Sequence, residues 1–185
     1  DKWQNLEPYR ITDELRAQLK TMNRQFHFYS KQKTAMKNNL IGLIDQTYPN
    51  ANTYFNSPTR SDGSQKWVDF VSTYWHVDCV RKMSLNAFVE HYQNWCRRKK
   101  YAFNKSKAEE IYAKAKELVP VFPKNEITKR IIRQAIDQLN STSVTVETIH
   151  SLMNETASKL PEYPIVMQFK GVGPSLGPQL MAEIG

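Results

Sequence analysis

The chain has 185 residues, of which 40% are hydrophobic, and 26 Lys or Arg outnumber 18 Asp or Glu to give a formal net charge of +8. This is enough apolar material for a folded core, and no apolar run reaches the roughly 18 residues of a membrane-spanning helix. We therefore expect a globular cytoplasmic protein with no membrane partner. Its positive charge favours a polyanionic ligand.

The excess of positive charge lies in one block. From Arg97 to Arg133 the chain has twelve Lys or Arg and four Glu, while the remainder has fourteen of each sign. This distribution is more informative than the total charge, because basic soluble proteins without a polyanionic partner also exist.

A coiled-coil pattern predicts one long helix over residues 13–48. Thr12 is its expected N-cap, and Pro49 ends it. Apolar positions recur with alternating gaps of four and three, interrupted only by Lys33. We expect this seam to mediate self-association of the chain as a homo-oligomer. The pattern is equally compatible with pairing of the long helices within one chain and between chains. The apolar members of the seam are Leu15, Leu19, Met22, Phe26, Tyr29, Met36, Leu40 and Leu43.

The same helix has no acidic residue between Leu15 and Ile44. Surface helices usually gain stability from oppositely charged residues four positions apart, so a helix with cations alone repels itself unless an anion binds. We therefore predict that its basic face binds nucleic acid, through Arg16, Lys20, Arg24 and Lys31.

Residues 49–123 are expected to form a small helical subdomain. A polar loop over 50–64 leads into apolar residues at helical spacing from Trp67 to Trp75. Ser84 is the predicted N-cap of the next helix, and Ser106 with Glu109 has the spacing of a capping box that opens a third helix over 107–118.

Aromatic and basic residues alternate where the second of these helices ends. Trp95, Tyr101 and Phe103 could stack on bases while the neighbouring cations contact phosphates. The same residues would equally suit the solvated, charged end of a helix. The candidate phosphate ligands are Arg97, Arg98, Lys99, Lys100, Lys105 and Lys107.

No catalytic or metal-binding arrangement is evident. Cys79 and Cys96 are too few for a disulfide framework. With His76 and His91 they could be drawn as a zinc site, but closely spaced ligand pairs are missing. We expect free thiols and no metal or cofactor in this region.

Residues 124–160 are predicted to form a second long helix that returns antiparallel to the first. Its apolar side runs from Ile127 to Leu160, and the β-branched run over 141–148 is a place where it should bend or break. The expected fold class is all-α: long coiled-coil helices with a small helical cluster at one end.

The last segment, 161–185, is expected to resemble a helix-hairpin-helix. Gly171 and Gly173 would let backbone N–H groups approach a phosphate beside Lys170, and Pro174 suits the first turn of a following helix. A plain glycine turn is the alternative. A dinucleotide fingerprint fails because Leu176 occupies the position of its third glycine.

Two stretches resemble the DEDD class of insertion-sequence transposases, which includes the Piv and MooV-type DNA recombinases. They are Leu15–Leu19 with Asn23–Gln25 and Asn38–Leu40, and Phe169–Pro174 continuing through Ala182–Gly185. Lys170 stands where the family usually has Pro. In that family a RuvC-like nuclease domain precedes a coiled coil, and a transposase domain follows it.

The resemblance implies a fragment of a DNA-transposing enzyme, with residues 1–12 as the tail of the nuclease domain and 161–185 as the start of the transposase domain. The four catalytic carboxylates, their divalent metal (Mg²⁺) and the serine nucleophile would lie outside it. Its partners would be DNA or a structured guide RNA and a second copy of the chain. A helical scaffold that binds a protein partner is the alternative function.

Overall fold

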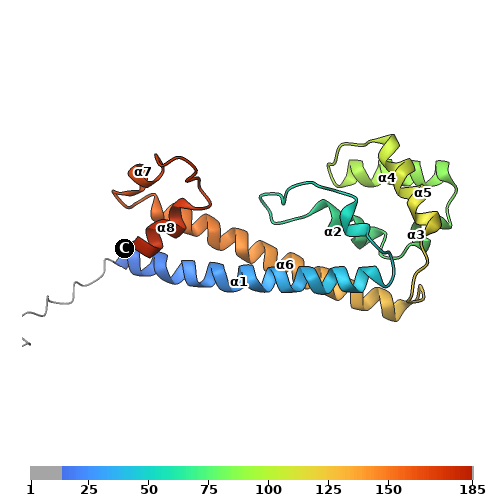
Figure 1. Cartoon of the computed structure of the whole chain (residues 1–185), viewed down its shortest axis with the longest axis horizontal. Coiled ribbons are helices and arrows are strands. Elements are labelled where there is room, and N and C mark those ends of the chain that lie inside the picture. Colours follow the sequence, from blue (N-terminus) through green and yellow to red (C-terminus); the bar gives the residue numbers. More distant parts are fainter. Residues whose placement is uncertain (1–13, 185) are drawn as a thin grey trace, which may run out of the picture. The chain divides into compact units, whose positions relative to one another are not determined.

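The computed structural model describes residues 14–184, and every regular element in that range is a helix (Figure 1). This confirms the all-α class. None of the described helices combines the length and apolarity that crossing a membrane requires. In chain order the elements are α1 (Glu14–Asp45), the short 3-10 helix η2 (Ala51–Thr53), α2 (Lys66–Thr73), α3 (Asp78–Arg81), α4 (Leu85–Arg98), α5 (Lys105–Glu117), α6 (Glu126–Ala157), α7 (Tyr163–Val166) and α8 (Gly177–Ile184).

The two long helices confirm the prediction of an antiparallel pair. Both α1 and α6 contain 32 residues. The described residues divide into two units, and each contains a part of both helices. The terminal unit comprises residues 14–30 and 145–184, and the central unit comprises residues 31–144.

In the terminal unit, the start of α1 packs against the end of α6 and against the short helices that follow. Leu19 is fully buried with Met153 and Ala157 of α6 and Met181 of α8. Four further apolar side chains are partly buried around them: Leu15, Met22 and Phe26 of the predicted seam, and Ile149 of α6. The seam is therefore used within the chain in this unit.

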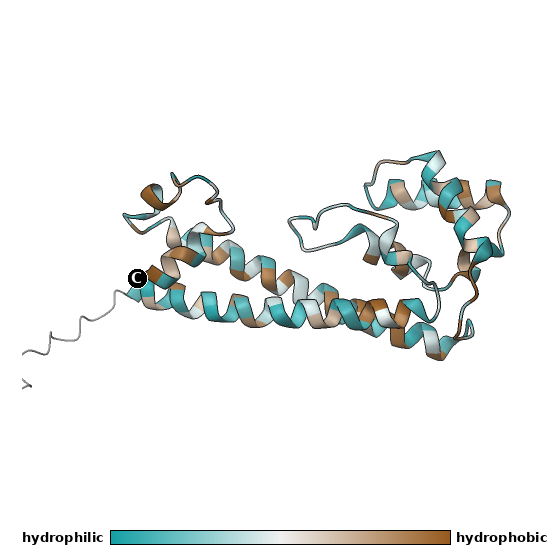
Figure 2. Cartoon of the chain, viewed as in Figure 1, coloured by the Kyte–Doolittle hydropathy of each residue, from teal (hydrophilic) through white to brown (hydrophobic). Residues whose placement is uncertain are grey.

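In the central unit, the end of α1 and the start of α6 support a core rich in aromatic rings. Hydrophobic residues of α1 gather toward Asp45, as Figure 2 shows, and Leu40 and Ile44 are fully buried. Around them lie the rings of Phe70, Tyr74 and Trp95, with Phe70 and Tyr74 at 4.7 Å between centroids. Such aromatic contacts stabilise a core beyond the area they bury.

The ends of the shorter helices were predicted with mixed success. Ser84 caps α4 as expected, since its Oγ accepts a hydrogen bond from the amide of Ala87 at 3.3 Å. The capping box of Ser106 and Glu109 is wrong: α5 begins two residues earlier, and the side chain of Asn104 caps it by accepting from the amide of Lys107 at 3.0 Å. Asn is among the best capping residues, which explains the shift.

The long helices also differ from expectation in detail. The first ends at Asp45 and continues as a turn in which the amides of Thr47 and Tyr48 both donate to the carbonyl of Ile44. Its predicted cap, Thr12, lies outside the described residues. The second runs without a break through 141–148. Ser143 and Val146 are buried there, and burial of that face offsets the weak helical propensity of β-branched residues.

Candidate nucleic-acid interface

The basic face of α1 in the terminal unit consists of Lys20 and Arg24, which are exposed and make no ion pair within residues 14–184. Arg16 behaves differently. Its Nη2 donates to Oε1 of Glu162 at 2.5 Å. The absence of acidic residues along the helix therefore did not leave Arg16 unpaired, because the chain supplies a carboxylate from 146 residues away.

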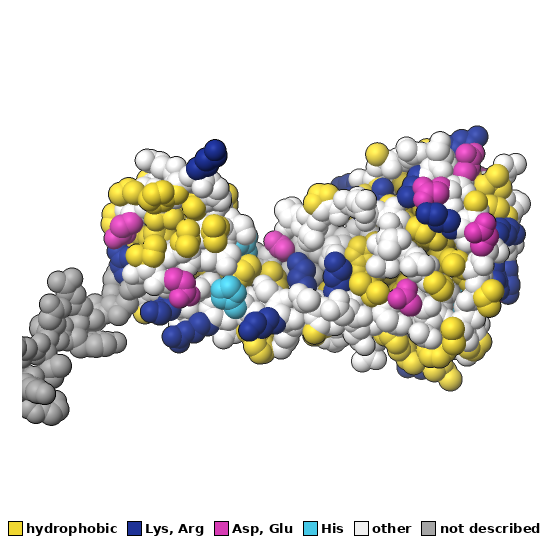
Figure 3. Space-filling view, viewed as in Figure 1, with side chains coloured by type: hydrophobic (Ala, Val, Ile, Leu, Met, Phe, Trp, Pro, Cys, Tyr) yellow, Lys and Arg dark blue, Asp and Glu magenta, His cyan; other side chains and the backbone are white. Residues whose placement is uncertain are grey.

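The part of α1 in the central unit adds Lys31 and Lys37, both exposed. Neither has an ion-pair partner among the described residues. Lys33, the polar member of the seam, is half-buried. Lysine and arginine side chains are seen along α1 on the face drawn in Figure 3.

The predicted self-association residues are covered to different degrees by their own chain. Leu19 and Leu40 are fully buried, while Tyr29 and Met36 are half-buried. Within the central unit, Met36 Sδ accepts a hydrogen bond from Thr142 Oγ1 at 3.0 Å. Contacts with a second copy through these residues stay a prediction.

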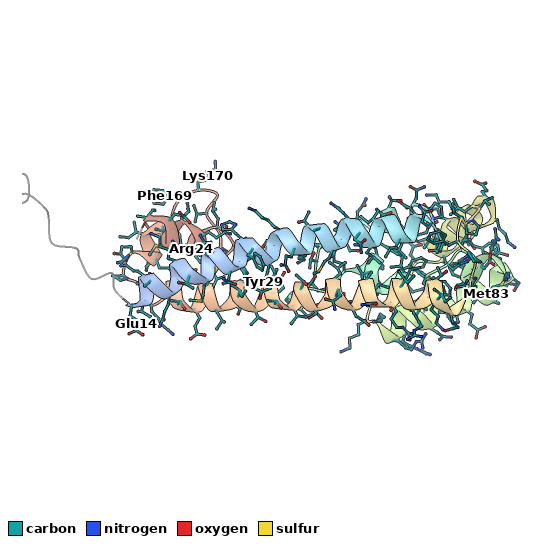
Figure 4. The ribbon with its side chains drawn as sticks, turned by 90° about the horizontal axis from the view of Figure 1, so that it is seen from below. Glu14, Arg24, Tyr29, Met83, Phe169 and Lys170 are labelled. Atoms are coloured by element: carbon teal, nitrogen blue, oxygen red, sulfur yellow. The ribbon has the colours of Figure 1, made fainter. Side chains whose placement is uncertain are left out.

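The turn around Gly171 and Gly173 in the terminal unit presents a cation and an aromatic ring. Lys170 and Phe169 lie at the outer rim of the loop between α7 and α8, and Phe169 is 62% exposed (Figure 4). Gly171 has φ of +91°, a conformation that glycine adopts without strain. Within residues 14–184 the amides of Gly171 and Gly173 donate no hydrogen bond, so both are open to an anion.

The helix after this turn begins later than predicted. The amides of Leu176 and Gly177 both donate to the carbonyl of Gly173, which closes a turn over these residues. Consequently α8 starts at Gly177, and Pro174 lies in the preceding turn instead of in the first helical turn. The two glycines therefore belong to a loop that is separated from the helix N-terminus by three residues.

A side chain of α6 fixes this turn. His150 Nε2 lies 3.1 Å from the carbonyl oxygen of Pro174, and its ring packs against Phe26 of α1 at 5.8 Å between centroids. Sequence patterns did not indicate this role for His150, because the two partners are 24 residues apart.

The basic block at the end of α4 is more extensively paired than expected. Lys99 Nζ lies 2.8 Å from Asp69 Oδ1, and Lys107 Nζ lies 2.9 Å from Glu110 Oε2. Lys105 lies 3.7 Å from Glu109. Arg98 and Lys100 are exposed and have no ion pair within the described residues, while Arg97 donates to Asn94 Oδ1 at 2.9 Å.

Most aromatic residues of this block are unavailable for stacking on bases. Trp95 is 1% exposed, and Tyr101 stacks on it at 5.3 Å between centroids. The hydroxyl of Tyr101 donates to Asp69 Oδ2 at 2.7 Å. Phe103 is 37% exposed. The alternation of aromatic and basic residues thus reflects a helix end whose rings enter the core, which corrects the prediction of a stacking surface.

Two basic residues that the sequence did not single out join this region. Arg60 and Lys66 come from the loop after η2 and from the first residue of α2, and both lie over the ring of Tyr101, at 4.0 Å and 5.0 Å from its centroid. Each stands alone in its local sequence. Only the tertiary structure brings them beside the basic block.

The histidines and cysteines of the zinc alternative make separate contacts. His76 accepts from the amide of Asp78 at Nδ1, and its Nε2 lies 3.1 Å from the carbonyl oxygen of Phe122. His91 Nδ1 lies 2.7 Å from the hydroxyl of Tyr74. Burial raises the pKa of the Cys96 thiol, which keeps it protonated.

Comparison with known proteins identified no relative. No family model, curated protein sequence or solved structure matches this chain.

Proposed function

We propose that this chain is the connecting region of a DNA transposase of the DEDD class and that it binds nucleic acid through its basic surfaces. One observation carries the binding proposal. Lys20, Arg24, Lys31 and Lys37 are exposed along a single helix and have no carboxylate partner within residues 14–184. Their mutual repulsion is relieved when a polyanion binds.

The turn from Phe169 to Pro174 supports the transposase proposal. It combines an exposed cation, two glycine amides without hydrogen-bond acceptors and an exposed aromatic ring. These groups suit a phosphate and an adjacent base. The motif also belongs to one of the two stretches that resemble transposases.

In this proposal the chain positions nucleic acid and does not cut it. Lysine and arginine side chains neutralise backbone phosphates and release counterions, which gives affinity without base specificity. Strand cleavage and rejoining would use carboxylates, Mg²⁺ and a serine from other parts of the parent protein. DNA and a structured guide RNA are both ligands of the required chemistry.

A salt titration tests the binding proposal. We expect the affinity for a duplex DNA and for a structured RNA to fall steeply with NaCl concentration, by about 0.9 in log K per log salt for each neutralised duplex phosphate. Lys20→Gln with Arg24→Gln should lower both the affinity and this slope without changing helicity. Binding that is absent at low salt, or independent of salt, would refute the proposal.

A second candidate function, a helical adaptor for a protein partner, is favoured by an apolar surface on the central unit. Val119, Val121 and Ile127 are 79%, 71% and 71% exposed. The same unit has a pocket of about 190 Å³ whose lining includes Phe122 and Ile131. Exposed apolar patches of this kind mark protein interfaces.

The two functions differ in which variants matter. Ile127→Ser with Ile131→Ser should leave nucleic-acid affinity unchanged if the chain acts through its basic surfaces. If the unaltered chain binds neither DNA nor RNA at low salt, the adaptor function is the better description.

A further inference from the structure

Three cations converge on the aromatic edge of the central unit. We call Arg60, Lys66 and Lys107 the cation cluster, because the charges of Arg60 and Lys107 both act on Lys66. Arg60 Cζ lies 4.0 Å from the centroid of Tyr101, and Lys66 Nζ lies 5.0 Å from the same centroid. Lys107, in the first turn of α5, has its Nζ 6.0 Å from the ring centroid of Tyr54. Three separate segments of the chain thus contribute one positive charge each.

Arg60 is held in place by the backbone. Its Nη2 donates to the carbonyl oxygens of Lys99 at 3.0 Å and Lys100 at 3.3 Å. Lys100 has φ of +56°, which turns the chain there. The loop that carries Arg60 is closed by a hydrogen bond from its amide to the carbonyl of Ser64 at 2.9 Å. The guanidinium group is therefore oriented before any ligand binds.

In the described part of the chain three carboxylates lie near the cluster, Asp62, Asp69 and Glu110, but only Glu110 forms an ion pair with one of its cations. Lys107 is paired with Glu110, but Arg60 and Lys66 make no ion pair within residues 14–184. Asp69 contacts the hydroxyl end of Tyr101, yet its two oxygens already accept from Tyr101 and Lys99. Burial, together with the charges of Arg60 and Lys107, lowers the pKa of Lys66. An anion at this place would relieve that unfavourable free energy.

We propose that Arg60, Lys66 and Lys107 form a binding site for a backbone phosphate of nucleic acid. This inference rests on the proposed nucleic-acid binding and assigns one of its contacts. A fixed guanidinium and two ammonium groups provide donors that match the oxygens of a phosphodiester. The cations also cover the rings of Tyr101 and Phe55, with Lys66 Nζ 4.9 Å from the centroid of Phe55. The site therefore contacts the backbone and reads no base.

Charge-removing variants with preserved packing test the site. Lys66→Met keeps an apolar stem over the rings of Tyr101 and Phe55. Lys82→Met is the control, because Lys82 is an exposed lysine of the same unit that lies outside the basic block and is paired with Asp78. We expect Lys66→Met to lower the affinity for a 20-nucleotide oligo(dT) several-fold and to reduce its salt slope by about 0.7, the value for one phosphate contact on a single strand. The control should change neither.

A labelling experiment on the unaltered chain gives an independent readout if Lys66→Met fails to fold. Limited acetylation followed by mass spectrometry should show that oligo(dT) protects Lys66 and Lys107, whereas Lys82, an exposed lysine paired with Asp78, stays reactive. Sodium tripolyphosphate serves as the comparison ligand. Protection by tripolyphosphate but not by oligo(dT) would overturn the assignment to a nucleic-acid backbone.

The remaining outcomes separate this inference from the proposed function. If oligo(dT) binds with a salt-dependent affinity while Lys66 stays reactive and Lys66→Met binds normally, the site is wrong and the proposed function stands. If neither DNA nor RNA binds the unaltered chain at low salt, both fail.

Discussion

His150 Nε2 lies 3.1 Å from the carbonyl oxygen of Pro174, so the imidazole donates a hydrogen bond that ties the glycine turn to α6 in the terminal unit. The bond requires the proton on Nε2, because a carbonyl can only accept. Asn154 Nδ2, which lies 3.3 Å from the same nitrogen, therefore finds its acceptor in the backbone carbonyl of His150 at 2.9 Å. The turn that presents Lys170 is thus fixed by a named side chain.

Replacing His150 should loosen this turn. We expect His150→Ala to cost about 1 kcal/mol of stability, the typical contribution of one hydrogen bond, and to weaken nucleic-acid binding about five-fold if the turn contacts phosphate. Hydrogen exchange of the amides between Lys170 and Leu176 should accelerate. His27→Ala is the control, since His27 also packs on Phe26 but is not hydrogen-bonded to the turn. Equal exchange in both variants would contradict this role.

The ion pair between Arg16 and Glu162 leads to a prediction with an unusual sign. The carboxylate neutralises a cation on the basic face of α1, so Glu162→Gln should raise nucleic-acid affinity and steepen its salt dependence. Because the pair is solvent-accessible, its loss should change the stability of the chain very little.

The matched variant for this experiment is Arg16→Gln. It removes a charge that is already compensated, so it should weaken binding less than Arg24→Gln does. Fluorescence anisotropy with a labelled duplex at two salt concentrations measures the affinity of Glu162→Gln, Arg16→Gln and Arg24→Gln. A stronger effect of Arg16→Gln than of Arg24→Gln would show that the pair opens when nucleic acid binds.

Sequence patterns predicted those features of the fold that depend on neighbours along the chain. The alternating apolar spacing from Leu15 to Leu43 identified α1, and Ser84 identified the start of α4. The break expected over 141–148 failed because helix propensity is weaker than the packing that buries Ser143 and Val146. Burial of that kind depends on partners distant in sequence, so a local pattern cannot contain it.

The candidate interface was less predictable than the fold for the same reason. Lys20 and Arg24 were found because a helix without acidic residues is visible in the sequence. The partner of Arg16 lies 146 residues away, and Arg60 and Lys66 reach the basic block only through folding. Composition indicates how much charge a chain carries, but tertiary contacts decide which charges stay available.

The buried His76 should make the central unit sensitive to mild acid. Burial lowers its pKa below the usual 6.5, so the folded chain holds it neutral. Protonation at Nδ1 would also break the hydrogen bond from the amide of Asp78. In the unfolded chain His76 takes up its proton near its usual pKa, so the unfolded state binds more protons as pH falls below about 6.5 and stability declines.

Urea denaturation at pH 7.5 and pH 5.5 measures this effect. Carboxylates with lowered pKa values, such as Glu110, lose their contribution only at lower pH, so they do not obscure the interval. The free energy of unfolding should be lower at pH 5.5 than at pH 7.5. We expect this difference in free energy to shrink in His76→Gln and to persist in His27→Gln. A His76→Gln variant that keeps the full difference would assign the acid sensitivity to another group.

Gly63 should be among the least replaceable residues of the central unit. Its φ of +80° is strained for any residue with a side chain, and an added Cβ would lie 2.9 Å from the backbone carbon and oxygen of Ser143 in α6. We expect Gly63→Ala to destabilise the chain by about 2 kcal/mol, within the usual cost of a strained backbone. Gly42→Ala is the internal control, since nothing lies within 4 Å of an added Cβ there and alanine favours the helical backbone of α1 by up to about 1 kcal/mol. If the urea midpoint falls in Gly63→Ala and rises in Gly42→Ala, the loop carrying Arg60 rests directly on α6. If Gly63→Ala leaves the urea midpoint unchanged, this loop can move away from α6 without loss of stability.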